Sequence, residues 1–148
     1  MDERVRKLTT PQQCEIFSRN ALDRDRPDLA HEARLRAVEL RAESHNAKSE
    51  AEKEALEAVY AYEEVLSQKN GKKTRASRTW QMIKRHGIIE AVERAVNRRA
   101  ETLGYTSLVE MGLEKFAFEA VILRHPEVFS EDAIQKSKER LSTWKDFE

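Results

Sequence analysis

The side chains best suited to chemistry in this sequence are the cations between positions 69 and 99. This stretch, which begins KNGKKTRASRTWQMIKRHGII, holds ten Lys or Arg residues against two acidic residues, Glu90 and Glu93, a net charge of +8. A cluster of this sign attracts polyanions, and the release of counterions from neutralised phosphates is the main sequence-independent contribution to nucleic-acid binding. We therefore expect this segment to contact the phosphate backbone of DNA or RNA.

Individual residues of the segment suit different parts of such an interface. Asn70 and Gly71, with the lysines after them, predict a mobile basic loop, and arginine can bind phosphate oxygens or a guanine edge through two parallel hydrogen bonds. Ser77 or Thr79 could cap a following helix, whose N-terminus would also favour phosphate. Trp80 could stack on a base or anchor that helix to the core. The expected nucleic-acid-binding residues are Lys72, Lys73, Arg75, Arg78, Trp80, Lys84, Arg85, Arg94 and Arg98.

The same segment has the outline of a helix-turn-helix. Its pattern predicts a short helix over about 78–85, a turn that includes Gly87, and a longer helix that begins at Ile88. A glycine turn between two amphipathic helices is typical of that motif. Glu90 and Glu93, however, lie near the start of the second helix, where base-reading residues normally lie and where carboxylates would repel the backbone. We therefore expect phosphate contact rather than sequence reading.

No pattern of catalytic or metal-binding residues accompanies the basic segment. The four histidines are scattered, and the sequence contains no HExxH, no glycine-rich phosphate loop and no GxSxG. Cys14 lies on the apolar side of an expected helix, so we expect a buried structural thiol. Glu119 lies inside the most apolar stretch, where we expect an ion pair with Arg124 or another nearby cation. The sequence therefore predicts a protein that is not an enzyme and uses no cofactor.

The elements that position these residues are expected to be helices, because strand alternation is nearly absent. Glycine and proline fall where helices begin or end, and Thr10 and Pro11 read as an N-cap and a first helical residue. We predict an all-α fold, a compact to elongated bundle of six or seven helices. A helical hairpin lies at its N-terminus and the helix-turn-helix-like element in its C-terminal half. The last long apolar stretch, 113–124, is expected to be one central helix.

Length and composition set the remaining bounds. The chain has 148 residues, of which 36% are charged, and its zero net charge favours a folded protein with a thin core. We expect a helical scaffold over 1–70 and a basic subdomain over 71–148, sharing one core. One cysteine excludes an intrachain disulfide and is typical of a reducing compartment. Because no apolar stretch follows Met1 and no run reaches transmembrane length, we expect a soluble, cytoplasmic protein with no membrane contact.

Two classes of function fit these features. The first is a non-enzymatic nucleic-acid-binding protein, with a regulatory or accessory role, that binds DNA or RNA through residues 69–99. The alternative is a helical protein-interaction module or homo-oligomeric adaptor, in which a homodimer or a protein partner replaces nucleic acid. In that alternative the N-terminal helical hairpin and the acidic flanks, residues 1–68 and 100–148, each with a net charge of −4, recruit the protein partner or the second copy.

Overall fold

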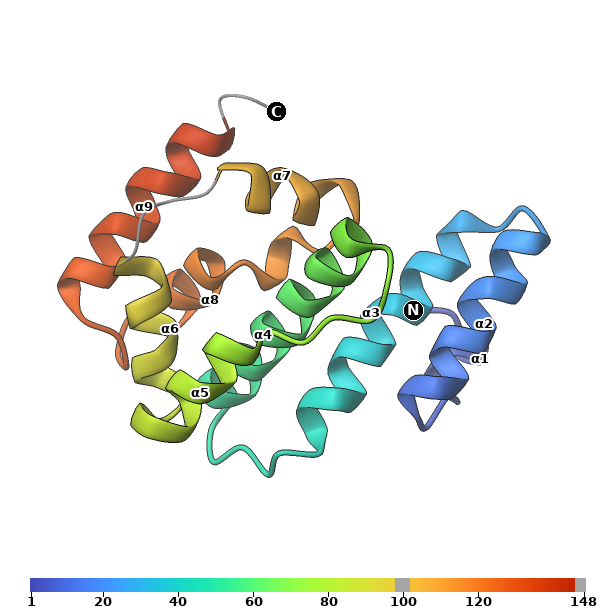
Figure 1. The fold of residues 1–148 in the computed structure, drawn as a ribbon, viewed down its shortest axis with the longest axis horizontal. Coiled ribbons are helices and arrows are strands. Elements are labelled where there is room, and N and C mark those ends of the chain that lie inside the picture. Colours follow the sequence, from blue (N-terminus) through green and yellow to red (C-terminus); the bar gives the residue numbers. More distant parts are fainter. Residues whose placement is uncertain (98–101, 146–148) are drawn as a thin grey trace. The chain divides into compact units, whose positions relative to one another are not determined.

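The computed structural model describes residues 1–97 and 102–145 of the chain, and every regular element among them is a helix (Figure 1). The all-α prediction is therefore confirmed. Contacts within the chain divide it into two compact units, Met1–Ala47 and Lys48–Glu148. In the described part of the chain, no helix is both long enough and apolar enough to cross a membrane.

The first unit consists of α1 (Glu3–Arg6), α2 (Pro11–Asp23) and α3 (Pro27–Glu43). α2 starts where the sequence predicts, because the Thr10 hydroxyl accepts a hydrogen bond from the Gln13 backbone N–H. Pro11 suits the first helical position, since it has no backbone N–H that would be left without an acceptor there. α2 and α3 form a hairpin whose facing side chains are mostly small, which allows the two helices to approach closely. The buried residues of the pair are Cys14, Ala21, Leu29, Ala30, Ala33, Ala37, Val38 and Ala42.

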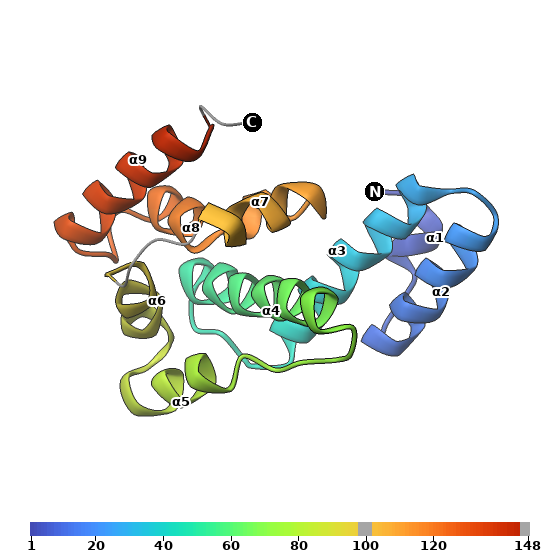
Figure 2. The same ribbon diagram turned by 45° about the horizontal axis from the view of Figure 1, so that its top comes forward.

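The second unit is built around its longest helix, α4. Its helices are α4 (Glu50–Asn70), α5 (Ser77–His86), α6 (Ile88–Asn97), α7 (Thr102–Glu110), α8 (Phe118–Arg124) and α9 (Glu131–Lys145). α6, α7 and α8 pack against α4, and α9 packs against α8 and α6. Two views of the ribbon show α7 and α8 on one side of α4 and α5 on the other (Figure 1, Figure 2). α5 is therefore a peripheral helix of this unit.

The described residues form nine α-helices and one 3-10 helix, more than the six or seven predicted. One reason is that α1 has only four residues, which is too short to show an apolar period. The other is that 113–124 is not one helix. A 3-10 helix (Glu114–Phe116) comes first, Ala117 is extended with ψ of 142°, and α8 then begins. The apolar run conceals this break because no glycine or proline marks it.

The boundary between the two compact units lies between Ala47 and Lys48, before α4, whereas the division expected from the sequence follows α4, near residue 70. The side of α4 that is buried explains the difference. Ala55, Val59 and Val65 are buried, and the main packing contacts of α4 are with α6, α7, α8 and the 3-10 helix. Helical spacing shows that α4 has an apolar stripe, but it does not show which helices cover that stripe.

Candidate nucleic-acid interface

One carboxylate holds α5, the helix with most of the expected binding residues, to α4. The Glu63 side chain is 13% exposed, and its Oε2 accepts hydrogen bonds from the Ala76 backbone N–H at 2.8 Å and from the Trp80 Nε1–H at 2.7 Å. The Trp80 ring also packs against Tyr60 of α4, with 5.2 Å between the ring centroids. Because Ala76 is the N-cap residue, Glu63 accepts a hydrogen bond from a backbone N–H that has no acceptor within α5.

This arrangement corrects one expectation for the start of α5 and favours one of the two roles expected for Trp80. The N-cap residue is Ala76, so neither Ser77 nor Thr79 caps the helix. A carboxylate, rather than an open anion site, lies against the first turn. Trp80 anchors α5 to α4, since its ring packs on Tyr60 and its indole N–H donates to Glu63.

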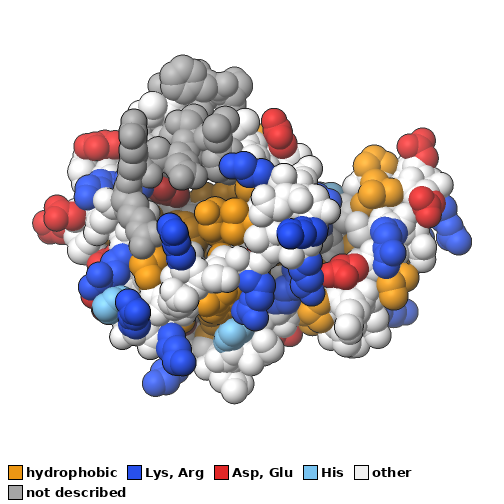
Figure 3. All heavy atoms as spheres, in the orientation of Figure 1, with side chains coloured by type: hydrophobic (Ala, Val, Ile, Leu, Met, Phe, Trp, Pro, Cys, Tyr) orange, Lys and Arg blue, Asp and Glu red, His pale blue; other side chains and the backbone are white. Residues whose placement is uncertain are grey.

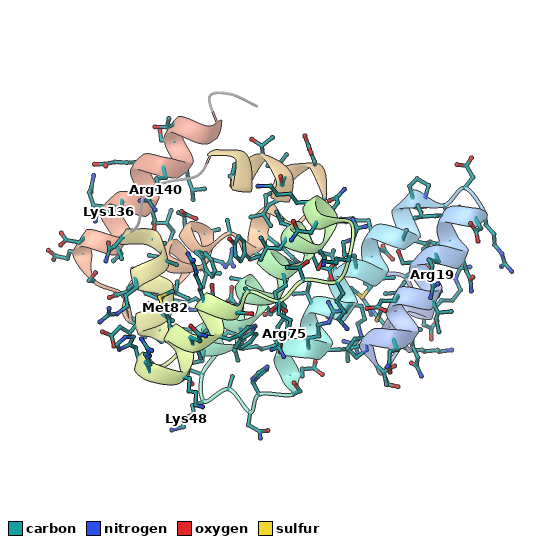
Figure 4. The ribbon with its side chains drawn as sticks, in the orientation of Figure 1. Arg19, Lys48, Arg75, Met82, Lys136 and Arg140 are labelled. Carbon is teal, nitrogen blue, oxygen red and sulfur yellow. The ribbon has the colours of Figure 1, made fainter. Side chains whose placement is uncertain are left out.

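Arg75 lies beside the same cluster, in the loop before α5 (Figure 4). Its Nε is 3.7 Å from Glu63 Oε2, and its guanidinium carbon is 5.5 Å from the centroid of the Trp80 ring. Its side chain is nevertheless 67% exposed. Arg75 therefore adds positive potential to the surface, but part of its charge is already balanced by Glu63.

Five of the expected cations are exposed and have no carboxylate partner in residues 1–97 and 102–145. They are Lys72, Lys73, Arg78, Lys84 and Arg85. We call them the free cations of the α5 face. Figure 3 shows Lys and Arg side chains gathered over α5, α6 and the loop before α5. A surface whose cations are solvated and not paired keeps its attraction for phosphate.

The side chains of α6 make more contacts within the protein than the sequence indicates. Arg94 Nη2 is 3.2 Å from Glu90 Oε1, and Glu90 Oε2 lies 3.7 Å from His86 Nδ1. Glu93 Oε1 accepts a hydrogen bond of 2.5 Å from the Ser130 backbone N–H, at the start of α9. The two carboxylates that would repel phosphate are thus engaged within the protein. The buried residues of α6 are Ile88, Ala91, Val92 and Val96, and the expected Arg98 lies outside the described residues.

Gly87 alone separates α5 from α6. Its φ is 86° and its ψ is 165°, a conformation that favours glycine, although a Cβ there would meet no atom within 4 Å. The requirement for glycine is therefore in the backbone and not in packing. The conformation of Gly87 fixes the direction of α6 relative to α5.

Two other ionisable clusters tie helices of the second unit together. Glu119 lies 3.5 Å from Arg140 of α9, so its partner is not Arg124, and burial raises the pKa of its carboxyl. Arg124 Nε is instead 2.5 Å from Oε1 of Glu54 on α4, and His125 bonds the other oxygen of that carboxylate. Burial opposes the ionisation of Glu54, but the hydrogen bonds from His125 and Arg124 outweigh it and lower its pKa. Both clusters join neighbouring helices.

The remaining candidates for chemistry offer no site. Cys14 is buried in the first unit, as expected, and burial raises the pKa of its thiol. Among the residues that the structure describes, no three His, Cys, Asp or Glu side chains are grouped to hold a metal ion. The α5 face is therefore the candidate functional surface.

The role of Glu63 could not be predicted from the sequence, because it lies 13 residues before Ala76 and 17 before Trp80, and no local pattern joins a carboxylate to a helix start at that distance. Gln81, which is exposed among the free cations, was not among the expected residues either. Comparison of the chain with protein-family models, curated proteins and solved structures gives no significant match. What the surface can do follows from its geometry and charge.

Proposed function

We propose that this protein is a non-enzymatic nucleic-acid-binding protein of the cytoplasm that contacts the phosphate backbone through the α5 face. The observation that carries the proposal is the set of five exposed cations without carboxylate partners in the described part of the chain, Lys72, Lys73, Arg78, Lys84 and Arg85. Each can neutralise a phosphate and release a counterion. A regulatory or accessory role in handling DNA or RNA fits a protein of this kind.

The structure supports different contributions from the other expected residues. Arg75 and Arg94 are each paired with a carboxylate, so they add to the potential of the surface more than to direct binding. Trp80 positions α5 and does not offer its indole N–H to a ligand. The proposed helix-turn-helix-like element is α5, Gly87 and α6, and its exposed charge lies mainly on α5.

The test is fluorescence anisotropy with labelled duplex DNA and single-stranded RNA at several salt concentrations. If all five free cations contact duplex phosphates, the slope of log K against log salt is about −4.5. Lys72→Glu with Lys73→Glu should weaken binding and flatten the slope by about 2. Both side chains are exposed, so folding is not at risk. Absence of binding at low salt would end the proposal.

A control variant separates site-specific effects from the change in net charge. Arg6→Glu with Arg19→Glu makes the same change in charge at exposed positions of the first unit. The proposal expects its affinity and salt slope to stay close to those of the unchanged protein. Equal losses in the two double variants would show that net charge, and not the α5 face, governs binding.

The alternative function, a protein-interaction module or homo-oligomer, has one observation in its favour. Ile16 and Leu22 on α2 have exposed fractions of 53% and 54%, which is high for large apolar residues. Light scattering coupled to size-exclusion chromatography distinguishes the two functions. The alternative expects a dimer that Ile16→Lys dissociates and a protein that retains no nucleic acid.

A further inference from the structure

In a helix-turn-helix the second helix normally reads the bases, but here few side chains of α6 are free to contact base edges. One of its sides is buried against α4, α8 and α9. On its exposed side, Glu90 pairs with Arg94, and the Asn97 Oδ1 accepts a hydrogen bond of 3.0 Å from Lys136 Nζ. Insertion of α6 into a groove would require these contacts and the packing of α9 to be given up.

α5 has the opposite character. None of its residues is buried, and its exposed residues other than His86, which is the last of the helix, lie on one side. At about 100° per residue, Gln81 falls at the centre of that side. Arg78 and Arg85 flank Gln81 on one edge and Lys84 flanks it on the other. Trp80 and Ile83, which are half-buried, face the protein.

The side chains on this face have the donors and acceptors that base edges require. Arginine can bond both O6 and N7 of guanine, and glutamine can bond both N6 and N7 of adenine. The Gln81 amide forms no hydrogen bond with the described residues, so both its oxygen and its nitrogen are available.

The dimensions of α5 also suit a major groove. Arg78 and Arg85 are seven residues apart, which is about 10.5 Å along a helix axis, close to three base-pair steps of about 3.4 Å. A helix with its side chains is about 10–12 Å wide, and the major groove of B-form DNA is about 12 Å wide. The hydrogen bonds of Glu63 hold the N-terminus of α5 in place. Lys72 and Lys73, just before α5, can then contact the phosphates of one groove wall.

We propose that α5, and not α6, is the reading helix, and that it lies in the major groove of duplex DNA with Arg78, Gln81 and Arg85 directed at the base edges. This inference rests on the proposed nucleic-acid binding, but it assigns Arg78 and Arg85 to the base edges and leaves Lys72, Lys73 and Lys84 for the phosphates, for which the expected salt slope is about −2.7. It adds two things to the proposed function. The ligand is B-form duplex DNA, and Gln81 determines part of the sequence preference.

The first test compares duplex DNA and duplex RNA of one sequence, with single-stranded DNA as a third probe, at fixed low salt. The major groove of A-form RNA is too deep and narrow for side chains to read. Groove insertion therefore expects tighter binding to duplex DNA than to either other probe. Equal affinity for the two duplexes, or tighter binding of the single strand, would overturn the inference while the proposed phosphate contact would stand. No binding of any probe would overturn the proposed function itself.

The second test selects bound duplexes from a pool with a randomised centre and repeats the measurement with Gln81→Ala. An enriched sequence is expected, and the substitution should weaken its binding about tenfold, the discrimination of one good bidentate contact. Binding of an unselected duplex should weaken much less, because Gln81 carries no charge and the bidentate contact is lost only from the enriched sequence. The exposed amide has no partner in the described part of the chain, so folding is not at risk. No enrichment, or an enriched duplex bound equally by Gln81→Ala, would refute the role given to this residue.

Discussion

Replacement of Glu63 by alanine tests how α5 is held in place. Glu63 Oε2 accepts the N–H of Ala76 at 2.8 Å and the Nε1–H of Trp80 at 2.7 Å, and it also lies 3.7 Å from Arg75. None of the residues of α5 is fully buried, so the two hydrogen bonds to Glu63 hold this helix together with the packing of Trp80 on Tyr60. We expect Glu63→Ala to detach α5 locally and to leave the rest of the second unit folded.

The size of the effect follows from the two hydrogen bonds. A hydrogen bond to a charged group contributes about 1.5–3 kcal/mol. Both bonds end on one oxygen of a side chain that is 13% exposed, so they are not fully additive, and we expect about 3 kcal/mol for the pair. That loss lowers the protection of the α5 amides from hydrogen exchange by a little over 100-fold.

Hydrogen exchange read by mass spectrometry on peptides from α5 and α4 measures this directly. Gln81→Ala is the matched control, because it changes an exposed side chain on the same helix that has no partner in the described residues. Glu63→Gln keeps one acceptor oxygen in place. It should therefore lose only the part of the hydrogen-bond energy that depends on the negative charge, and the α5 amides should lose less protection than in Glu63→Ala. If α5 in Glu63→Ala exchanges as slowly as in the control, the anchoring assigned to this carboxylate is wrong.

Three further predictions follow from the ionisable groups. The pKa of Glu54 lies below its ordinary 4.5, because the hydrogen bonds from His125 and Arg124 outweigh the cost of burial. The contribution of Glu54 to stability is therefore present above pH 4.5 and is lost as the pH falls through the folded value. In urea titrations, Glu54→Gln should reduce the free energy of unfolding less in acid than at neutral pH. Burial raises the pKa of Glu119, so its contribution is largest below pH 4.5 and declines as the pH rises through the folded value; the unchanged protein should therefore gain stability relative to Glu119→Gln on acidification. The Cys14 thiol, buried and with a raised pKa, should react with a thiol reagent at pH 8 only in urea.

Local signals in the sequence were sufficient for much of the fold. Thr10 with Pro11 marks the start of α2, and Gly71, in the left-handed conformation with φ of 69°, ends α4. Both signals act within a few residues of the helix end that they specify. The break at Ala117 was missed because its neighbours are apolar and neither glycine nor proline marks the position.

The candidate site was predictable in charge but not in geometry. A count of charges gives the segment 69–99 its net +8 and includes Arg75 and Arg94, which carboxylates partly balance. The contact between Glu93 and Ser130 spans 37 residues, and no periodicity foretells it. For this reason the sequence could not show that α6 is committed to the core and that α5 is the exposed helix.

A substitution at Arg78 distinguishes a basic face that binds a ligand from one that is only solvated. Lys84 and Arg85 lie in the last turn of α5, where cations are favoured by the helix dipole, so their presence has a structural explanation. Arg78 lies in the first turn, where a cation is disfavoured, and it has no carboxylate partner among the described residues. Arg78→Ala should therefore leave stability unchanged or raise it by about 0.5 kcal/mol, while it weakens DNA binding. A variant that loses stability and retains its affinity would show that Arg78 serves the fold, and the basic face would then need no ligand to explain it.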